Sequence, residues 1–329
     1  MLSHAKKAVD TYTQRLGIDA ESFVVEIASN DGYLLKNFVE AGVRCLGVEP
    51  AENIAVVARE NGIDSWVDFF GEDLGRKIGE EKGKADLIIG NNVFAHVPDT
   101  IGFVAGISEL LSENGTACLE FPYGKELFER NEFDTIYHEH VFYFTVTPLV
   151  PLLARHGLEI YDVEALPIHG GSLRVWIGHE GHHEVEDAVG EVLTAEEAEG
   201  LKSMEYYETF GDRVRGVRDE LNRLISEAVS DGKTVAAYGA SAKGSTLLNY
   251  CDPSEESIDF IVDRSDIKQG LFSPGLHLPI LPPEELEKAM PDFTLLLTWN
   301  FADEILEQQS SYRDAGGKFI VPIPEVTVC

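Results

Sequence analysis

The sequence predicts two α/β units, each built around a mostly parallel sheet. The chain has 329 residues, which is too long for one ordinary hydrophobic core. Strand-like and helix-like segments alternate through the first half, and the alternation resumes after a long polar stretch near the middle. Because such alternation favours parallel strands joined by helical crossovers, we expect a doubly wound sheet in each half.

In the first half, five strand-like segments alternate with helix-like ones. Strands are predicted at 22–28, 43–50, 65–70, 85–92 and 116–122, with helices at 33–42, 51–62 and 100–115. After a polar and aromatic stretch come a helix at 148–157 and strands at 158–167 and 172–178. Five parallel strands closed by a hairpin are the plan of the Rossmann-like class I methyltransferase fold, which has a mostly parallel seven-stranded sheet.

The second half begins with a polar region, 184–230, that has helical character and no strand signal. A second Rossmann-like α/β unit begins at 233–250, with further strands at 257–263, 292–299 and 318–324. The predicted domains are therefore 1–183, which would bind a cofactor, and 184–329, a helical linker followed by a C-terminal α/β domain.

The net charge of the chain limits which partners it can bind. Asp and Glu number 58 against 26 Lys and Arg, a net charge of −32. This field repels nucleic acids and anionic membranes, so neither is expected as a partner. The sequence has no apolar run of membrane-spanning length and no signal-peptide core, which predicts a cytoplasmic protein. Acidic residues spread along the chain also suit a halophilic source; an acidic mesophilic enzyme is the alternative.

The loop after the first strand gives the clearest ligand-binding signal. In EIASNDGYLL (26–35), an acidic strand residue precedes a short turn with one glycine, and a helix follows directly. A dinucleotide favours Gly-x-Gly-x-x-Gly here, whereas two carboxylates suit an ammonium-bearing cation. The loop therefore predicts S-adenosylmethionine as cofactor. Its predicted cofactor-binding residues are Glu26, Ala28, Ser29, Asn30, Asp31 and Gly32.

Three later segments extend this predicted site. Glu49 and Pro50 end the second strand, where a carboxylate can accept both hydroxyls of a ribose. Phe70 can lie against an adenine, and a core aromatic residue is the equal alternative. Asn91 and Asn92 end the fourth strand, at the sheet edge where a ligand is expected.

The motifs of the chain resemble those of the sugar C-methyltransferases. They occur in order across nearly the whole chain: EIASNDGYLL, GVEP, NNVFAHVPD, EFPY, FDTIYHEHVFYFT, GGSLRVW, YGASAKGSTLLNY and PGLHLPI. The resemblance implies methylation at carbon 3 of a nucleotide-linked 4-keto-deoxy sugar. Members of the family usually begin with a cysteine-rich zinc domain. This chain starts at MLSHAKKAVD, which resembles the segment just after that domain, so substrate contacts from it are in question.

The segment FDTIYHEHVFYFT (133–145) carries the predicted acid–base group. If it is a strand, His138 and His140 share one face. The resemblance implies that His140 removes the proton on carbon 3 and that Tyr137 and Glu139 orient the sugar or the base. An imidazole, with its usual pKa near 6.5, suits this task. The resemblance also implies that His96, in NNVFAHVPD, belongs to the active site.

Two alternatives for this segment stay open. Its two histidines and His96 can share a metal ion, but methyl transfer from a sulfonium needs no Lewis acid, so no metal is expected. An aromatic strand with incidental polar side chains is the alternative without chemistry. Four further histidines fall in turns or polar stretches and are expected at the surface: His169, His179, His182 and His183.

The loop YGASAKG (238–244) is predicted to bind the nucleotide of the substrate. Its glycines and Ser241 can expose amides and Lys243 adds a cation, which together form a cradle for a pyrophosphate. Arg174 is a second candidate positive contact. The alternatives are an NAD-dependent nucleotide-sugar oxidoreductase, which needs glycines that both loops lack, and a non-catalytic nucleotide-sugar-binding protein.

Overall fold

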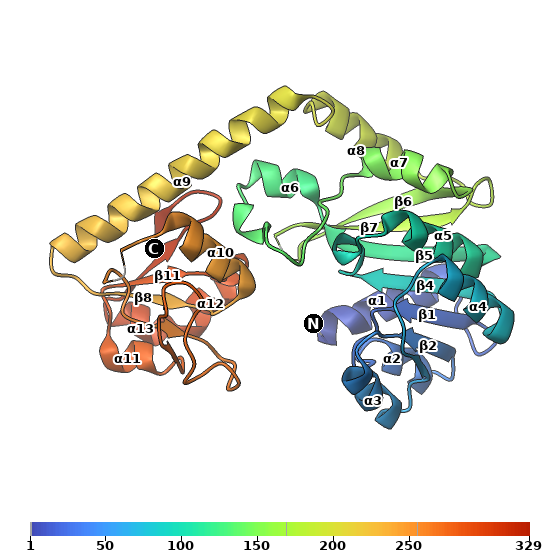
Figure 1. Ribbon diagram of the computed structural model, residues 1–329, viewed down its shortest axis with the longest axis horizontal. Helices are drawn as coiled ribbons and strands as arrows, with labels where there is room; N and C mark the ends of the chain where they lie inside the picture. Colours follow the sequence, from blue (N-terminus) through green and yellow to red (C-terminus); the bar gives the residue numbers. More distant parts are fainter. Residues whose placement is uncertain (1, 169, 255) are drawn as a thin grey trace. The chain divides into compact units, whose positions relative to one another are not determined.

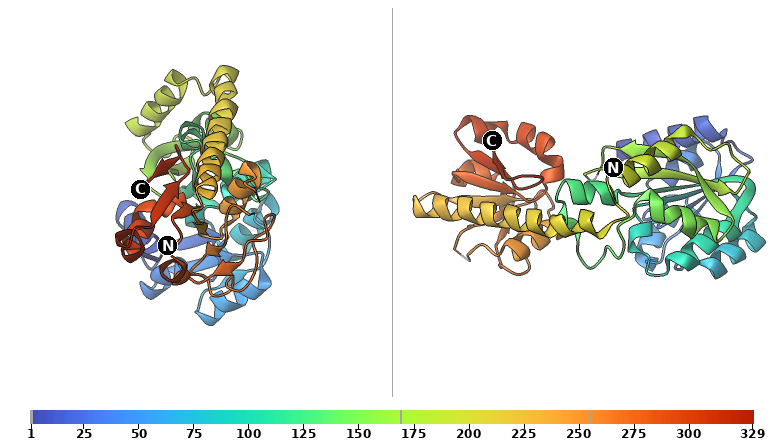
Figure 2. Two further views of the ribbon diagram at one scale, coloured as in Figure 1. Left: turned by 90° about the vertical axis from the view of Figure 1, so that its left-hand side faces the viewer. Right: turned by 90° about the horizontal axis from the view of Figure 1, so that it is seen from above.

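The computed structural model describes residues 2–168, 170–254 and 256–329 and divides into two compact units. The first unit contains the chain up to Tyr123 together with Val141–Glu199, and the second contains Gly124–His140 and Gly200–Cys329. Figures 1 and 2 show both units, coloured along the sequence. This division differs from a boundary after residue 183, because 124–140 belongs with the second unit and 184–199 with the first.

The first unit is built on a seven-stranded sheet. Its strands are β1 (Phe23–Ile27), β2 (Arg44–Val48), β3 (Ser65–Trp66), β4 (Ala85–Asn91), β5 (Leu111–Pro122), β6 (Leu158–Leu166) and β7 (Ser172–His179). The order is β3-β2-β1-β4-β5-β7-β6, and only the pairings of β7 with β5 and β6 are antiparallel. The predicted mostly parallel sheet closed by a hairpin is confirmed.

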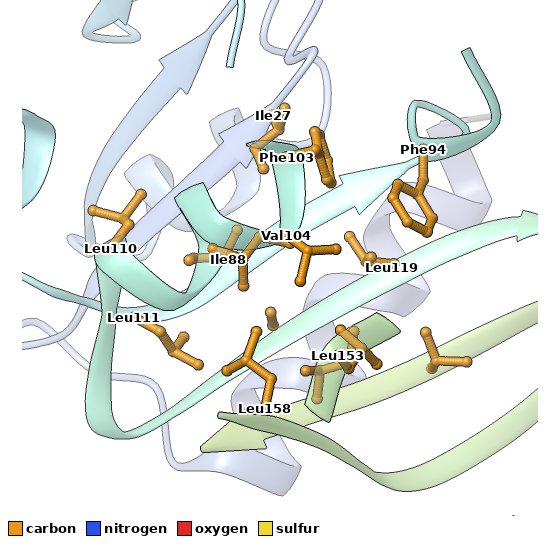
Figure 3. Close-up of a cluster of buried hydrophobic side chains, with 14 of the residues drawn as sticks. Ile27, Ile88, Phe94, Phe103, Val104, Leu110, Leu111, Leu119, Leu153 and Leu158 are labelled. Atoms are coloured by element: carbon orange, nitrogen blue, oxygen red, sulfur yellow. The ribbon is translucent and has the colours of Figure 1, made fainter. Parts of the chain in front are cut away.

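Helices cover both faces of this sheet. They are α1 (Leu2–Leu16), α2 (Leu35–Glu40), α3 (Glu52–Glu60), α4 (Glu72–Lys82), η1 (Phe94–His96), α5 (Thr100–Leu110), α7 (Val146–Ala154) and α8 (Asp187–Ala198). Alternate residues of β1 face opposite sides: Val25 and Ile27 pack with α4, α5 and α7, and Val24 packs with α1 and α2. Figure 3 shows the first of these layers, where Phe103 and Leu153 meet the sheet.

The second unit has a six-stranded sheet. Its strands are β8 (Val235–Tyr238), β9 (Ile261–Val262), β10 (Ile280–Leu281), β11 (Phe293–Leu296), β12 (Lys318–Val321) and β13 (Thr327–Val328). The order is β10-β9-β8-β11-β12-β13, parallel except for the last pairing. Among the residues that the structure describes, its helices are α6 (Gly124–Glu129), η2 (Phe133–Thr135), α9 (Met204–Ser230), α10 (Ala242–Cys251), α11 (Glu285–Ala289), η3 (Trp299–Phe301), α12 (Ala302–Gln308) and α13 (Ser310–Asp314).

The strand considered for residues 133–145 is wrong. The segment begins with the short helix η2, turns at His138 and Glu139, and ends with one isolated bridge at Phe144. Phe133 is buried in the core of the second unit and Phe144 in that of the first, so the segment crosses from one unit to the other and joins neither sheet. Along the described chain, no helix is long and apolar enough to cross a membrane.

Candidate active site

The loop after β1 lies at the edge of the sheet where the strand order reverses, with β2 on one side and β4 on the other. Ligands of open parallel sheets bind at this kind of position. Ala28 and Asn30 adopt left-handed φ angles of 56° and 52°, which side chains other than glycine rarely adopt. Asn30 Nδ2 donates to the Ala28 carbonyl at 2.9 Å, and the Gly32 amide donates to the Ser29 carbonyl at 3.0 Å. These bonds hold a strained turn, a feature common at functional sites.

Close packing under this turn explains a glycine in β2. A side-chain carbon at Gly47 would lie 2.4 Å from Ser29 Oγ, so only glycine lets β2 approach the loop. Ser29 is fully buried, and its Oγ has no hydrogen-bond partner. A buried hydroxyl without a partner is costly unless a ligand satisfies it.

Glu26 is the most unusual group of this loop. It is 2% exposed, and its Oε2 atom has no hydrogen-bond partner. Burial, and then the charges of Asp31 and Glu49, raise the pKa of Glu26 well above its usual value. Asn91 Oδ1, at the end of β4, is also buried without a partner. Such acceptors fit a ligand that brings an ammonium group and hydroxyls, and S-adenosylmethionine has both.

Glu49 clamps the loop from the end of β2. Its Oε2 accepts the Asn30 amide at 3.1 Å and its Oε1 accepts the Ala51 amide at 2.9 Å. Each carboxylate oxygen keeps a second lone pair, so ribose hydroxyls can still bind there. Pro50 follows and is half-buried.

Phe70 is half-buried against the core of the first unit, where its ring meets Phe103 edge-on at 5.4 Å. Its neighbour Phe69 is 80% exposed. Packing therefore accounts for most of the Phe70 ring, and its contact with an adenine stays a prediction.

The end of β4 brings a predicted histidine to the same sheet edge. Asn92 has a φ of 51° and donates its amide to the Glu120 carbonyl at 2.7 Å. The short helix η1 follows and ends at His96, which is half-buried. The amides of Val141 and Phe142 both donate to the carbonyl of Ala95, at 2.9 and 3.2 Å, and so tie the returning chain to η1.

His140 has a defined hydrogen-bond geometry. Its Nδ1 atom lies 2.8 Å from the Thr135 carbonyl oxygen, and its Nε2 atom lies 3.2 Å from the Tyr137 hydroxyl. A carbonyl oxygen can only accept, so Nδ1 carries the proton and the neutral ring has its lone pair on Nε2. Burial, and then the charges of Glu139 and Asp134, raise the pKa of Tyr137, so its hydroxyl stays a donor.

Glu139 does not fix the His140 tautomer, because the Thr135 carbonyl does so. The exposed carboxylate of Glu139 lies 3.8 Å from Nε2 of His138, whose side chain is 86% exposed. The role of Glu139 in holding a sugar hydroxyl stays a prediction.

In the loop of the second unit, Ser241 and Lys243 both have partners within that unit. Ser241 caps α10, with its Oγ accepting the Gly244 amide at 3.1 Å. The ammonium of Lys243 lies 4.0 Å from the centre of the Trp299 ring and bonds to Asn300 Oδ1. Burial lowers the pKa of Lys243 to about 8, opposed by the charges of Asp134 and Glu132. Its side chain is therefore packed within its own unit, and its contact with a phosphate stays a prediction.

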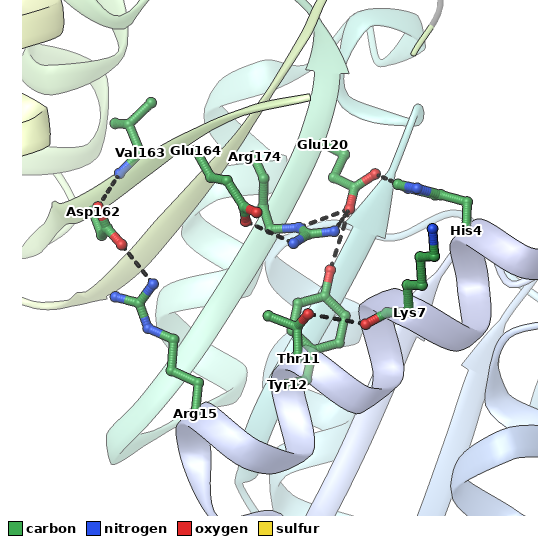
Figure 4. Close-up of polar contacts among 10 residues, drawn as sticks. All are labelled: His4, Lys7, Thr11, Tyr12, Arg15, Glu120, Asp162, Val163, Glu164 and Arg174. Carbon is green, nitrogen blue, oxygen red and sulfur yellow. Dashed lines mark hydrogen bonds and ion pairs between the residues drawn. The ribbon is translucent and has the colours of Figure 1, made fainter. Parts of the chain in front are cut away.

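Arg174 lies in β7 of the first unit and is 3% exposed. Figure 4 shows its guanidinium between two carboxylates: Nε and Nη2 donate to Glu120 Oε1 at 2.8 and 2.6 Å, and Nη1 donates to Glu164 Oε2 at 2.7 Å. His4 and Tyr12 of α1 reach the same Glu120, at 2.9 and 3.5 Å. These contacts occupy Arg174 and give no support to a phosphate contact from it.

Sequence reasoning missed several polar residues of these sites. Glu120 lies inside an apolar strand, and an acid in such a strand is a signal for a buried ion pair. Burial, and then the charges of Glu26 and Glu120, raise the pKa of Tyr33 to about 12. Thr135 had no signal, because it acts through its backbone. Within the described residues, no group of three or more His, Cys, Asp or Glu is arranged to hold a metal. Of the histidines expected at the surface, His182 is exposed, His179 and His183 are half-buried, and His169 lies outside the described residues.

Comparisons with known proteins cover both halves. A family model for the C-methyltransferase C-terminal domain matches residues 167–324, and one for a methyltransferase domain matches residues 1–163. The C-methyltransferase NovU of Streptomyces niveus is 41% identical over 329 residues, which is 100% of this chain and 78% of that protein. These matches confirm the resemblance drawn from the sequence motifs.

Solved structures similar to this one cover about half of the chain. A SAM-dependent methyltransferase from Anabaena variabilis is 17% identical and covers 55% of this chain and 86% of its own, with a TM-score of 0.44. The magnesium protoporphyrin IX methyltransferase of Synechocystis, with bound SAH, is 12% identical; the match covers 54% of this chain and 83% of that protein, with a TM-score of 0.43.

Proposed function

Because the chain belongs to the family of S-adenosylmethionine-dependent C-methyltransferases, we propose that it methylates carbon 3 of a nucleotide-linked 4-keto-deoxy sugar through an enolate. The observation that carries this proposal is His140, whose Nδ1 is bonded to a carbonyl and whose Nε2 faces a tyrosine hydroxyl. An NAD-dependent oxidoreductase is set aside, because both loops lack the required glycines and the family transfers methyl groups.

His140 and Tyr137 have different tasks in the proton transfer. The Nε2 lone pair of His140 takes the proton from carbon 3, and the bond electrons move into an enolate with its charge on the 4-keto oxygen. The Tyr137 hydroxyl, 3.2 Å from Nε2 before substrate binds, then turns to donate to that oxygen. S-adenosylmethionine, when bound, supplies an electrophilic methyl group on a sulfonium for the carbon end of the enolate.

The cofactor is proposed to bind at the β1 loop. Glu26 and Asp31 face its ammonium group, the Glu49 carboxylate accepts its ribose hydroxyls, and Ser29 and Asn91 complete its contacts. Three buried acceptor atoms without a hydrogen-bond partner support this set, one each in Glu26, Ser29 and Asn91.

The nucleotide is proposed to bind to the second unit at the carboxyl ends of β8, β9 and β11. A cavity of about 270 Å³ lies there, lined by Tyr238, Asp263 and Phe301 among others. Asp263 accepts the amides of Ala240 at 2.7 Å and Ser265 at 2.8 Å. The position suits a nucleotide, because a carboxylate at the end of a strand can accept a sugar hydroxyl and Phe301 offers a ring for the base.

A substitution that removes the imidazole tests whether His140 is the base. We expect His140→Asn to lower turnover of a 4-keto nucleotide sugar by about 100- to 10,000-fold. Exchange of the carbon 3 proton with deuterated water, measured by mass spectrometry without cofactor, should fall in parallel. His138→Asn is the matched control, because it makes the same change two residues away at an exposed side chain.

Near-normal exchange in His140→Asn would remove this residue from the base role. A panel of 4-keto nucleotide sugars, incubated with cofactor and analysed by mass spectrometry, identifies the sugar. Fragmentation of the product then locates the new methyl group. A product methylated on oxygen or nitrogen would contradict the proposal.

A further inference from the structure

A buried polar cluster in the second unit is unused by the proposed mechanism. We call it the η2 anchor, and it consists of Asp134, Trp299 and Lys243. Asp134 is 0% exposed and Trp299 7%, and the Trp299 indole N–H donates to Asp134 Oδ2 at 2.7 Å. The Lys243 ammonium lies on the Trp299 ring, 4.0 Å from its centre.

The charges within the anchor are complementary. Asp134 is a buried carboxylate, and burying such a group without a cation costs several kcal/mol. Its charge and that of the buried Glu132 favour the protonated form of Lys243. Lys243 is thus a cation whose charge acts on both buried acids, in a chain with a net charge of −32.

The anchor acts on the short helix η2, of which Asp134 is the central residue. The amides of Thr135 and Ile136 donate to the carbonyls of Glu132 and Phe133, at 3.1 and 3.0 Å, and close the turn. Phe133 packs on Tyr250, with ring centres 5.0 Å apart. Because the turn is this short, the place where Asp134 is held sets the direction of the Thr135 carbonyl.

That carbonyl is the partner of His140 Nδ1, at 2.8 Å. A neutral imidazole can carry its proton on either nitrogen, and a net hydrogen-bond contribution of about 1 kcal/mol shifts the ratio of tautomers about fivefold. The alignment of this backbone carbonyl, together with the Tyr137 hydroxyl at Nε2, therefore sets which nitrogen of His140 is basic.

We propose that Asp134, Trp299 and Lys243 are positioning residues for His140, which hold η2 so that the Thr135 carbonyl keeps the imidazole proton on Nδ1 and the lone pair on Nε2. This inference rests on the proposed role of His140 as base. It gives Lys243 a function other than phosphate contact. It also connects two motifs that lie about 100 residues apart in the chain, YHEH and YGASAKG.

Three conservative variants of the full chain test the anchor. Trp299→Phe keeps an aromatic ring and removes the N–H donor, Asp134→Asn keeps the size and removes the charge, and Lys243→Met keeps the length and removes the cation. Thr294→Val is the control, because it removes another buried hydrogen bond of the same unit, 2.9 Å to the Tyr312 hydroxyl.

The direct measurement is ¹⁵N NMR of the histidine rings at a pH above 7.5. The chain has 10 histidines, and the signals of His140 are identified by their loss in His140→Gln. We expect the Nδ1–H form in the wild type and a shift toward the Nε2–H form by about fivefold in each anchor variant. We also expect kcat to fall by up to about fivefold with KM within about twofold, and no tautomer shift in Thr294→Val.

The proposal is overturned if the tautomer of His140 in all three variants equals that of the wild type while thermal stability falls as in Thr294→Val. The cluster would then be structural only. If one variant does not fold, the other two decide. Failure of the proposed function has a different signature: turnover persists in His140→Gln, whereas the NMR comparison still reports whether the anchor sets the tautomer.

Discussion

The loops after the first strand of each unit share one hydrogen-bond arrangement and differ in what they leave unsatisfied. In each unit, a carboxylate at the end of the neighbouring strand accepts one amide of the loop and the amide two residues beyond itself: Glu49 in the first unit and Asp263 in the second. An acid at this position is thus a structural clamp in both units, and its presence alone does not identify a ligand.

The groups around the two clamps differ. Beside Glu49 lies a second buried acid, Glu26, with an oxygen that has no hydrogen-bond partner, and the charges that act on its pKa are those of Asp31 and Glu49. Beside Asp263 lies a cation, since the Lys268 ammonium is 2.8 Å from the Ala240 carbonyl and 3.8 Å from Asp263 Oδ2. The first loop therefore suits a cationic ligand, and the second suits one without positive charge.

The largest effect in this comparison is expected from Glu26→Gln. Loss of the charge that faces the ammonium group should weaken S-adenosylhomocysteine binding by about 10- to 100-fold, because hydrogen bonds to charged groups contribute about 1.5–3 kcal/mol. Titration calorimetry measures it. Binding of a nucleoside diphosphate to the second unit should be unchanged, and a parallel loss of both would show that the two sites are not independent.

The raised pKa of Glu26 predicts that ligand affinity changes at a higher pH than it would for a carboxyl group at the surface. A cationic ligand favours the ionised carboxylate, so at pH values below the raised pKa of Glu26 binding releases its proton. Affinity for S-adenosylhomocysteine should rise with pH, by up to about tenfold per pH unit below the pKa of Glu26. Calorimetry in two buffers of different ionisation enthalpy detects the proton, and Glu26→Gln should abolish its release.

Asp263→Asn is the counterpart in the second unit. We expect it to weaken nucleoside diphosphate binding by about tenfold, since one charge-assisted hydrogen bond to a sugar hydroxyl is lost. S-adenosylhomocysteine binding should stay within about twofold. Tyr238→Phe is a second variant, because it removes a buried hydroxyl of the same cavity that has no partner at hydrogen-bond geometry. Unchanged nucleotide binding in both variants would contradict the assignment of this cavity.

The smallest expected effect concerns stability. Burial raises the pKa of Glu132 to about 7 from its usual 4.5, with Lys243 opposing the shift. The folded state then binds more protons than the unfolded state between these values, so the stability that Glu132 contributes at low pH is lost as pH rises to 7. Between pH 5 and pH 8, the free energy of unfolding of the wild type should fall by about 1 kcal/mol relative to that of Glu132→Gln. The effect is smaller than an isolated group would give, because neighbouring groups titrate in the same range. Urea denaturation measures this, with the exposed Glu81→Gln as control.

The fold of the first unit could be predicted because its strands are apolar runs bounded by turn residues, as in ADLIIGNN. Glu26 and Glu49 could be assigned to the ligand edge of the sheet because each lies near the carboxyl end of a strand-like segment, although Glu49 also clamps the loop. The segment 133–145 could not, since its aromatic residues are buried in two different cores and only the tertiary structure separates them. The surroundings of Lys243 could not be predicted for a related reason: its ammonium lies on the ring of Trp299, which is 56 residues away in the chain.

The route of the chain has a consequence for exchanging parts between related enzymes. The second unit is made of two separate pieces, Gly124–His140 and Gly200–Cys329, and the first piece contributes Phe128, Asn131 and Asp134 to contacts within that unit. A chimera that replaces only the C-terminal piece would combine a foreign Trp299 with a resident Asp134. The second unit can therefore be exchanged intact only if both pieces are transferred together, and inherited variation in one piece should track variation in the other.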